Sequence, residues 1–190
     1  MENEIKSFSA KNDHAEADMT AMVVMSHGDE GEISSTDGEV LMIEWILEQF
    51  KNSNCPSLRG KPKIFIFNSC RGSRGDPGVP ATATDNGERV SSWGDMIIVY
   101  STIPGHYSLR NTKDGSWFVQ SLCKVFREKA TTYEITEMLN ADVSNRLSEH
   151  QTWSGMKQPF EYAVRPPFKK LYFFPDSGNT GSSRGKYILL

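Results

Sequence analysis

Cysteine is scarce in this sequence, and long apolar runs are absent. The three cysteines, Cys55, Cys70 and Cys123, are too few and too scattered for a disulfide framework, or for metal ligation with the four histidines. We therefore expect a reduced, cytoplasmic protein that uses no metal or other cofactor. No stretch reaches the roughly 18 apolar residues that would span a bilayer, and residues 1–13 lack the apolar run of a secretion signal.

Charge of one sign is not in excess either. The formal net charge is −3, and acidic and basic residues are interspersed, so no broad positive surface for phosphate backbones is indicated. Neither nucleic acid nor a membrane is an expected partner. A chain of 190 residues is long enough to form one α/β domain with a substantial core.

Three short, continuous apolar runs predict strands that are buried on both faces: 21–25 (AMVVM), 64–67 (IFIF) and 96–100 (MIIVY). A late strand is predicted at 170–174 (KLYFF), directly before Pro175.

Helical spacing of apolar residues follows the first and third of these runs. The pattern predicts a helix over 40–50, and a second from Trp117 onward, capped by Asp114 or Ser116. Thr131 with Glu134 resembles a capping box and predicts a third helix. Strands that alternate with helices indicate a mostly parallel sheet between two helical layers, a three-layer α/β/α sandwich.

Two segments do not fit this pattern. Residues 72–94 are rich in Gly, Pro, Ser and Thr and too long for a tight connection, which indicates a mobile loop or a processing linker. Residues 177–190 are predicted to be a flexible tail, whose apolar tip (YILL) has no assigned role.

A histidine and a cysteine follow two of the predicted strands. His27 comes after 21–25 and Cys70 after 64–67, and ligand sites of open α/β sheets form at such carboxyl ends. Thiolate attack on an amide needs a nucleophile, a proton donor for the leaving amine, and N–H donors for the oxyanion. Cys70, His27 and the N–H groups of Gly28 and Cys70 could supply them. Taken singly, either side chain could equally be an ordinary structural residue.

Motifs along most of the chain resemble the caspase family of cysteine proteases. The segment NSCRG at 68–72 is similar to the caspase signature QAC[RQG]G, which has a histidine about 50 residues upstream. The other matching segments are SHG at 26–28, GKPK at 60–63, YST at 100–102, PG at 104–105, YSLRN at 107–111 and DGSWFVQSLC at 114–123.

The resemblance implies one caspase-like domain with an antiparallel last strand. Residues 1–85 would be its large-subunit-like part, shortened at the N-terminus, and 86–176 its small-subunit-like part. Within the linker, Asp85 is the expected processing site of a zymogen, and Asp76 is a poorer one because Pro77 follows it. The alternative is a solvated loop that happens to contain aspartates.

The resemblance also implies cleavage of protein substrates after aspartate by the dyad His27 and Cys70. Arg110 matches one of two arginines that hold the substrate carboxylate, and a guanidinium suits a carboxylate bidentately. Asn68 stands where the family usually has a glutamine. Arg71 is more often structural in that family.

Other site residues implied by the resemblance lie in 107–111. Tyr107 and Leu109 match a hydrophobic wall for the next substrate side chain, although a tryptophan is usual where Leu109 stands. Ser108 and Arg110 would offer backbone groups to an extended peptide, and Asn111 would contact a residue further along it.

The sequence departs from the family at its start, where two strands, a helix and the first aspartate-binding arginine are expected. We therefore expect an open sheet edge beside 21–25, uncovered apolar surface, and weakened aspartate cleavage. Two hypotheses follow: an aspartate-directed endopeptidase in apoptosis or proteolytic signalling, or a catalytically impaired regulator or decoy that binds a full-length caspase.

Retention of His27, Cys70 and Arg110 favours the first hypothesis, whereas Asn68, Leu109 and the missing arginine favour the second. By resemblance, the expected partners are a second copy or another caspase, bound through the strand at 170–174, together with inhibitor or adaptor proteins.

Overall fold

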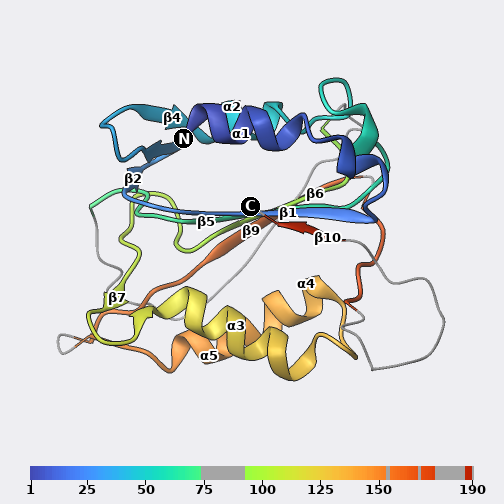
Figure 1. Ribbon diagram of the computed structural model, residues 1–190. Helices are drawn as coiled ribbons and strands as arrows, with labels where there is room; N and C mark the ends of the chain where they lie inside the picture. Colours follow the sequence, from blue (N-terminus) through green and yellow to red (C-terminus); the bar gives the residue numbers. More distant parts are fainter. Residues whose placement is uncertain (74–92, 153–154, 167, 174–186, 190) are drawn as a thin grey trace.

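A computed structural model describes residues 1–73, 93–152, 155–166, 168–173 and 187–189. Three layers are visible in Figure 1, as the strand and helix pattern predicted. Helices α1 (Glu2–Ser9) and α2 (Ile43–Glu48) cover one face of the central sheet. The other face is covered by α3 (Trp117–Lys129) and a second helical run, made of α4 (Ile135–Glu137), the π-helix η3 (Met138–Val143) and α5 (Ser144–Ser148).

The central sheet has the order β10-β1-β5-β6-β9. Its strands are β1 (Met19–Met25), β5 (Lys63–Asn68), β6 (Met96–Tyr100), β9 (Glu161–Arg165) and β10 (Tyr187–Leu189). All neighbours pair in parallel except β9, which runs antiparallel to β6. The mostly parallel sheet with an antiparallel strand is therefore confirmed, as are the strands at the three apolar runs. Burial on both faces is confirmed for β5 and β6 but not for the second half of β1.

The antiparallel strand is β9, not 170–174, so the predicted late strand is wrong. Among the described residues of that segment, only Tyr172 makes a β-bridge, to Glu134. Leu171 and Phe173 instead pack, partly buried, against the core beneath the sheet, which accounts for their apolar character. Strand β9 lies at an edge and is half exposed, so it lacks the continuous apolar run of a central strand.

Two helices begin later in the sequence than predicted. Val40–Met42 forms strand β4, which pairs with β3 (Glu32–Ser34) and through it with β2 (Gly28–Asp29), so α2 begins only at Ile43. The third helix begins at Ile135 with Glu134 as its cap, because the Glu134 carboxylate accepts the backbone N–H groups of Thr136 and Glu137. Ser116 caps α3 as predicted, accepting the Val119 N–H.

The remaining short elements are the 3-10 turns η1 (Asn12–Ala15) and η2 (Pro56–Leu58), and a hairpin of β7 (Arg110–Asn111) and β8 (Gly115–Ser116). In the described ranges, no helix combines the length and the apolar character needed to cross a membrane.

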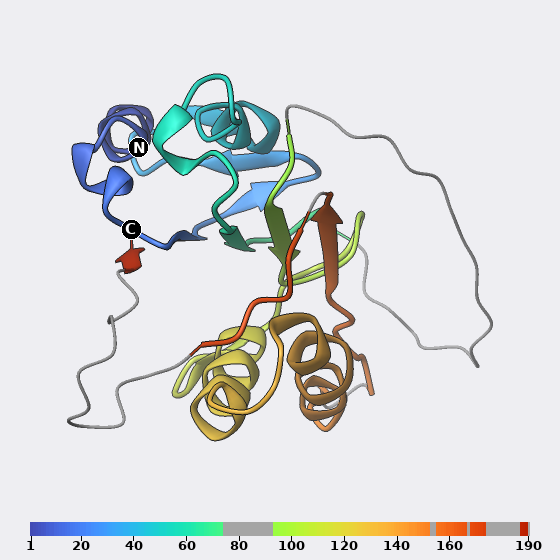
Figure 2. The ribbon, with the colours of Figure 1, turned by 90° about the vertical axis from the view of Figure 1, so that its right-hand side faces the viewer.

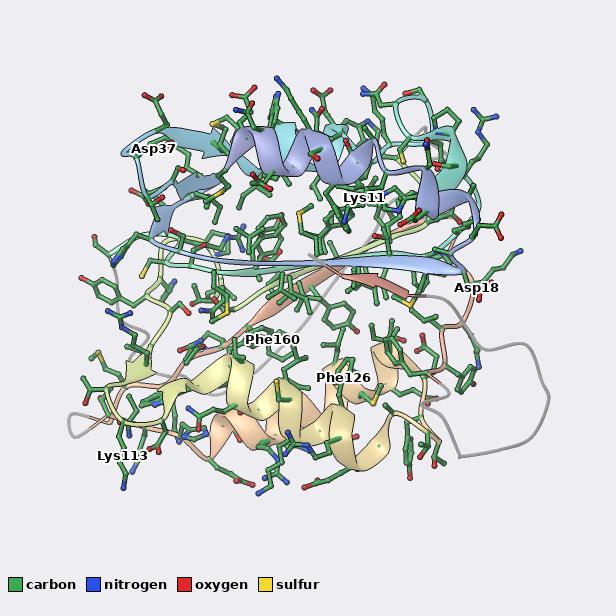
Figure 3. All side chains as sticks on the ribbon, viewed as in Figure 1. Lys11, Asp18, Asp37, Lys113, Phe126 and Phe160 are labelled. Carbon is green, nitrogen blue, oxygen red and sulfur yellow. The ribbon has the colours of Figure 1, made fainter. Side chains whose placement is uncertain are left out.

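Side chains fill both spaces between the sheet and its helical layers (Figure 3). Ile5 and Phe8 of α1 are each 1% exposed and belong to the core above the sheet. The expectation of uncovered apolar surface is therefore wrong on this face, because α1 supplies the cover. It is confirmed at the second half of β1, where Val23 and Met25 are 41% and 56% exposed. Phe118 and Leu139 lie in the second core, between the sheet and α3 to α5.

The edge of β1 carries a partner strand that the sequence did not predict. β10 pairs in parallel with its first half, from Met19 opposite Tyr187 to Ala21 opposite Leu189, and Figure 2 shows β10 (red) beside the start of β1. The predicted open edge is thus covered over Met19–Ala21. Of the tail predicted to be flexible, 187–189 form this strand, and 177–186 and 190 lie outside the described residues.

Candidate active site

The parallel pairing of β1 and β5 sets the geometry at their carboxyl ends. Its register ends with Met25 opposite Asn68, and the Ser26 N–H donates to the Asn68 carbonyl at 3.3 Å. His27 and Cys70 therefore leave the sheet at the same end, on adjacent strands. Figure 1 shows β2 and β7 at that end. His27 is exposed and Cys70 is half-buried.

Gly28 brings the turn after β1 against the turn after β5. A Cβ atom on Gly28 would lie 3.1 Å from the Ser69 Cβ and 2.4 Å from the Glu32 carbonyl oxygen. The His27 carbonyl accepts the Ser34 N–H at 2.9 Å, and the Ser26 hydroxyl donates to the Ser34 carbonyl at 2.6 Å. The turn that carries His27 is thus fixed by β3 on one side and touches the residue before Cys70 on the other.

The turn after Cys70 packs against 104–106. The Arg71 N–H donates to the His106 carbonyl at 2.9 Å, and the Gly105 N–H donates to the Arg71 carbonyl. Gly72 has φ +138°, and a Cβ there would lie 2.4–2.6 Å from Gly105 backbone atoms. Only glycine allows this close approach, which holds the main chain beside the cysteine.

Arg71 makes structural contacts, as the resemblance implied. Its Nη1 lies 2.5 Å from Glu161 Oε2 and 3.3 Å from the Thr102 carbonyl oxygen, and its guanidinium carbon lies 4.1 Å from the centroid of the Tyr100 ring. Burial raises the pKa of the Tyr100 phenol, and the positive charge of Arg71 opposes that shift. Arg71 thereby joins the cysteine turn to strand β9.

The structure brings Asn68 to the hairpin that carries Arg110. The Ser116 hydroxyl donates to Asn68 Oδ1 at 2.7 Å, and Ser116 is paired with Arg110 in the hairpin. Arg110, Asn111 and Tyr107 are exposed, the last with 43% of its surface accessible. In Figure 3, Lys113 marks the turn of the same hairpin.

Ser108 and Leu109 are half-buried and tied to a residue that the sequence did not single out. Gln158 is 3% exposed, and its Oε1 accepts the Leu109 N–H at 2.6 Å. No motif or periodicity marks a single glutamine so far along the chain. Only the three-dimensional structure, in which Gln158 lies beside Leu109, reveals this contact.

Asp76 and Asp85 lie outside the described residues. In the part of the chain that is described, no group of three or more His, Cys, Asp or Glu side chains is arranged to hold a metal ion. Cys55, Cys70 and Cys123 are free thiols, so a nucleophilic thiol at Cys70 is chemically available. The arrangement suits attack on a carbonyl beside a histidine and a basic, exposed hairpin.

Comparison with known proteins gives concordant matches. A family model described as a caspase domain matches residues 1–172. Caspase-3 of Mesocricetus auratus and caspase-3 of Mus musculus are each 35% identical over 183 residues, covering 90% of this chain and 65% of the relative. Caspase-7 of Gallus gallus is 39% identical over 181 residues, covering 87% of this chain and 58% of the relative. The chain thus spans 58–65% of the length of these curated relatives.

Proposed function

The chain belongs to the caspase family, and on that premise we propose that it acts as a cysteine endopeptidase that cleaves proteins after aspartate in apoptosis or related proteolytic signalling. One observation carries the proposal most directly. His27 and Cys70 follow adjacent, parallel, in-register strands, and Gly28 packs against Ser69 between them.

In the proposed mechanism, His27 takes the proton of the Cys70 thiol, and the resulting thiolate attacks the carbonyl carbon of the scissile amide to form a C–S bond. The N–H groups of Gly28 and Cys70 donate to the oxyanion, where removal of one donor typically costs 10²- to 10³-fold in rate. His27 gives a proton to the amine nitrogen as the C–N bond breaks. Water then hydrolyses the thioester and regenerates the thiol.

Aspartate at the cleavage site would be held by Arg110 and Asn68. The Arg110 guanidinium offers paired donors to the carboxylate. Because Asn68 Oδ1 accepts from Ser116, the amide N–H groups of Asn68 are what it offers to a substrate. Tyr107 and Leu109 would contact the preceding substrate side chain, and Asn111 one further along. Ser108 and Arg110 would pair with the peptide backbone.

Cleavage after Asp85 would divide the chain into 1–85 and a small-subunit-like part, and Asp76 would be a secondary cleavage site. The support is that β5 and β6 pair along their length and that Arg71 bonds to His106 across the linker. Contacts of this kind hold two fragments together without the covalent connection. Processing would then free the linker ends without dissolving the site.

The proposed partners are protein substrates and a second caspase subunit. Within the described residues β9 pairs only with β6, so its outer edge is available to a second copy or to another caspase, and inhibitor or adaptor proteins could bind there. The three free thiols suit a reducing compartment, and we place the reaction in the cytoplasm.

A catalytically impaired regulator is the second candidate. Two observations favour it: Asn68 is a short amide already bound to Ser116, and Leu109 replaces an aromatic wall residue. Such a protein would bind a full-length caspase through β9 and need no chemistry at Cys70.

The protease and the regulator differ in whether the protein cleaves a substrate. The full chain is incubated with fluorogenic tetrapeptides that end in aspartate, while mass spectrometry follows cleavage at Asp85. The protease proposal expects fluorophore release by wild type and by Cys123→Ala, a control that removes an exposed thiol on α3, and none by Cys70→Ala. Equal, background rates in all three folded proteins would refute it in favour of the regulator.

A further inference from the structure

Gln158 lies where two segments of the candidate site meet. Its side chain is almost fully buried, at 3% exposed, in the segment that leads into β9. Its Nε2 donates to the Ser101 carbonyl at 2.6 Å, and its Oε1 accepts the Leu109 N–H at 2.6 Å. Both ends of the amide are therefore used, one on the residue after β6 and one on the residue before Arg110.

A buried serine extends this contact to the cysteine turn. The Ser101 Oγ, on a residue that is 0% exposed, lies 3.2 Å from the Ser69 carbonyl oxygen and 2.8 Å from Ser108 Oγ. Ser69 directly precedes Cys70. One set of buried and partly buried hydrogen bonds thus connects the cysteine turn, the end of β6 and the segment 107–111. Buried polar networks with satisfied partners hold their members in one arrangement.

The network also fixes which way the backbone of 108–110 faces. The Leu109 N–H bonds to Gln158, and the Leu109 carbonyl accepts the Trp117 N–H at 3.3 Å. Both polar backbone groups of Leu109 are therefore turned toward the fold. In an extended segment, neighbouring residues direct their N–H and C=O groups to opposite sides. The groups of Ser108 and Arg110 consequently face away from Gln158, toward the side open to a peptide.

We propose that Gln158 is a positioning residue for the substrate-binding segment: its amide anchors Leu109 so that Ser108 and Arg110 present their backbone groups to an extended peptide. This inference rests on the proposed function. An amide is required because one side chain must accept from Leu109 and donate to Ser101 at once. A carboxylate would keep the first contact and oppose the Ser101 carbonyl, and a thioether would keep neither.

The test compares wild type with Gln158→Met, Gln158→Glu and the control Gln151→Met. The control makes the same substitution at an exposed glutamine. Hydrogen exchange at the Leu109 amide is measured together with affinity for an aspartyl peptide aldehyde and, where turnover occurs, KM and kcat. In Gln158→Met we expect Leu109 to exchange and the KM to rise by roughly 10-fold. The kcat should change far less, and Gln158→Glu should keep Leu109 better protected.

Unchanged exchange at Leu109 in Gln158→Met would overturn the proposal. So would faster exchange spread evenly over the central strands, because that marks general destabilisation rather than loss of one anchor. If Gln158→Met does not fold, Gln158→Glu provides the test. The proposal then requires that Gln158→Glu bind the peptide aldehyde more weakly than Gln151→Met does, and equal binding would overturn it. Exchange does not depend on turnover, so an inactive wild type would reject the proposed protease while the anchoring of Leu109 is judged separately.

Discussion

Gly28 and Ser69 touch across the carboxyl ends of β1 and β5, at a separation that leaves no room for another methyl group. A Cβ on Gly28 would lie 3.1 Å from the Ser69 Cβ and 2.4 Å from the Glu32 carbonyl. This contact sets how near the His27 turn lies to the Cys70 turn. Any side chain at 28 must push the two turns apart or shift β3.

Gly28→Ala should therefore lower kcat/KM by about 100-fold, since a misplacement of about 1 Å has effects of that size. Steady-state kinetics with an aspartyl tetrapeptide measures the loss. The control is Gly31→Asn, because no atom of the described segments lies within 4 Å of a Cβ at Gly31 and asparagine tolerates its φ of +78°. Comparable losses of kcat/KM in the two variants would show that activity does not depend on the contact between Gly28 and Ser69.

Arg71→Met should destabilise the protein by about 2 kcal/mol, within the range of hydrogen bonds to charged groups. The substitution removes the contacts to Glu161 and the Thr102 carbonyl and the stacking on Tyr100. Urea denaturation gives the free energy of unfolding. Glu161→Gln keeps a hydrogen-bond acceptor at the half-exposed end of the pair and should cost less than half as much. An equal loss in both would assign the effect to the ion pair alone.

The pH dependence of stability should contain a contribution from His14. This ring is fully buried, and its Nε2 lies 2.7 Å from the Phe8 carbonyl oxygen. Its buried Nδ1 has no hydrogen-bond partner among the residues that the structure describes. Burial lowers the pKa of His14 below its ordinary value of 6.5. The unfolded chain therefore takes up the proton first as the pH falls, and the stability present above about pH 6.5 decreases below it.

His14→Gln replaces the ring with a side chain that can donate to the Phe8 carbonyl and does not titrate near neutral pH. The free energy of unfolding of wild type should fall more between pH 7.5 and pH 5.5 than that of His14→Gln. Urea denaturation at both pH values measures the difference. Parallel pH profiles would contradict the assignment, since carboxylates common to both proteins would then explain the whole slope.

Removal of 187–190 should expose the backbone edge of Met19–Ala21, which β10 now covers. An uncovered edge next to apolar side chains favours pairing with another chain. Sedimentation velocity should show self-association, and the melting temperature should fall. A truncated protein as monomeric and stable as the full chain would show that β10 is dispensable.

What could be predicted from the sequence follows from where each residue is buried. Strands β5 and β6 are buried over most of their length, so they appear as continuous apolar runs. Strand β1 is an apolar run as well, although Val23 and Met25 in its second half are exposed. Strand β9 lies at an edge and has no such run, and α1 buries mainly Ile5 and Phe8 within a polar segment. β10 was missed because its partner, β1, lies at the other end of the chain.

In the candidate site, too, some residues could be predicted from the sequence and others could not. His27 and Cys70 were predictable because each directly follows a recognisable strand and lies in a motif. The contact of Asn68 with Ser116, and the anchoring of Leu109 by Gln158, join residues far apart in sequence and depend on tertiary structure alone. No local pattern encodes such pairs, so only the fold could indicate them.

The role of Cys70 as an aspartate-directed nucleophile is tested most directly by finding which thiol reacts with an aspartyl peptide fluoromethyl ketone. This electrophile alkylates a nucleophilic cysteine with loss of fluoride. The full chain is labelled, the adduct is located by mass spectrometry, and a matched peptide ending in lysine serves as the control. We predict a single adduct at Cys70, at least about 100-fold faster with aspartate than with lysine, and slowed by His27→Ala. Labelling of the more exposed Cys123 at a similar rate, or equal rates with both peptides, would contradict an aspartate-directed nucleophile at Cys70.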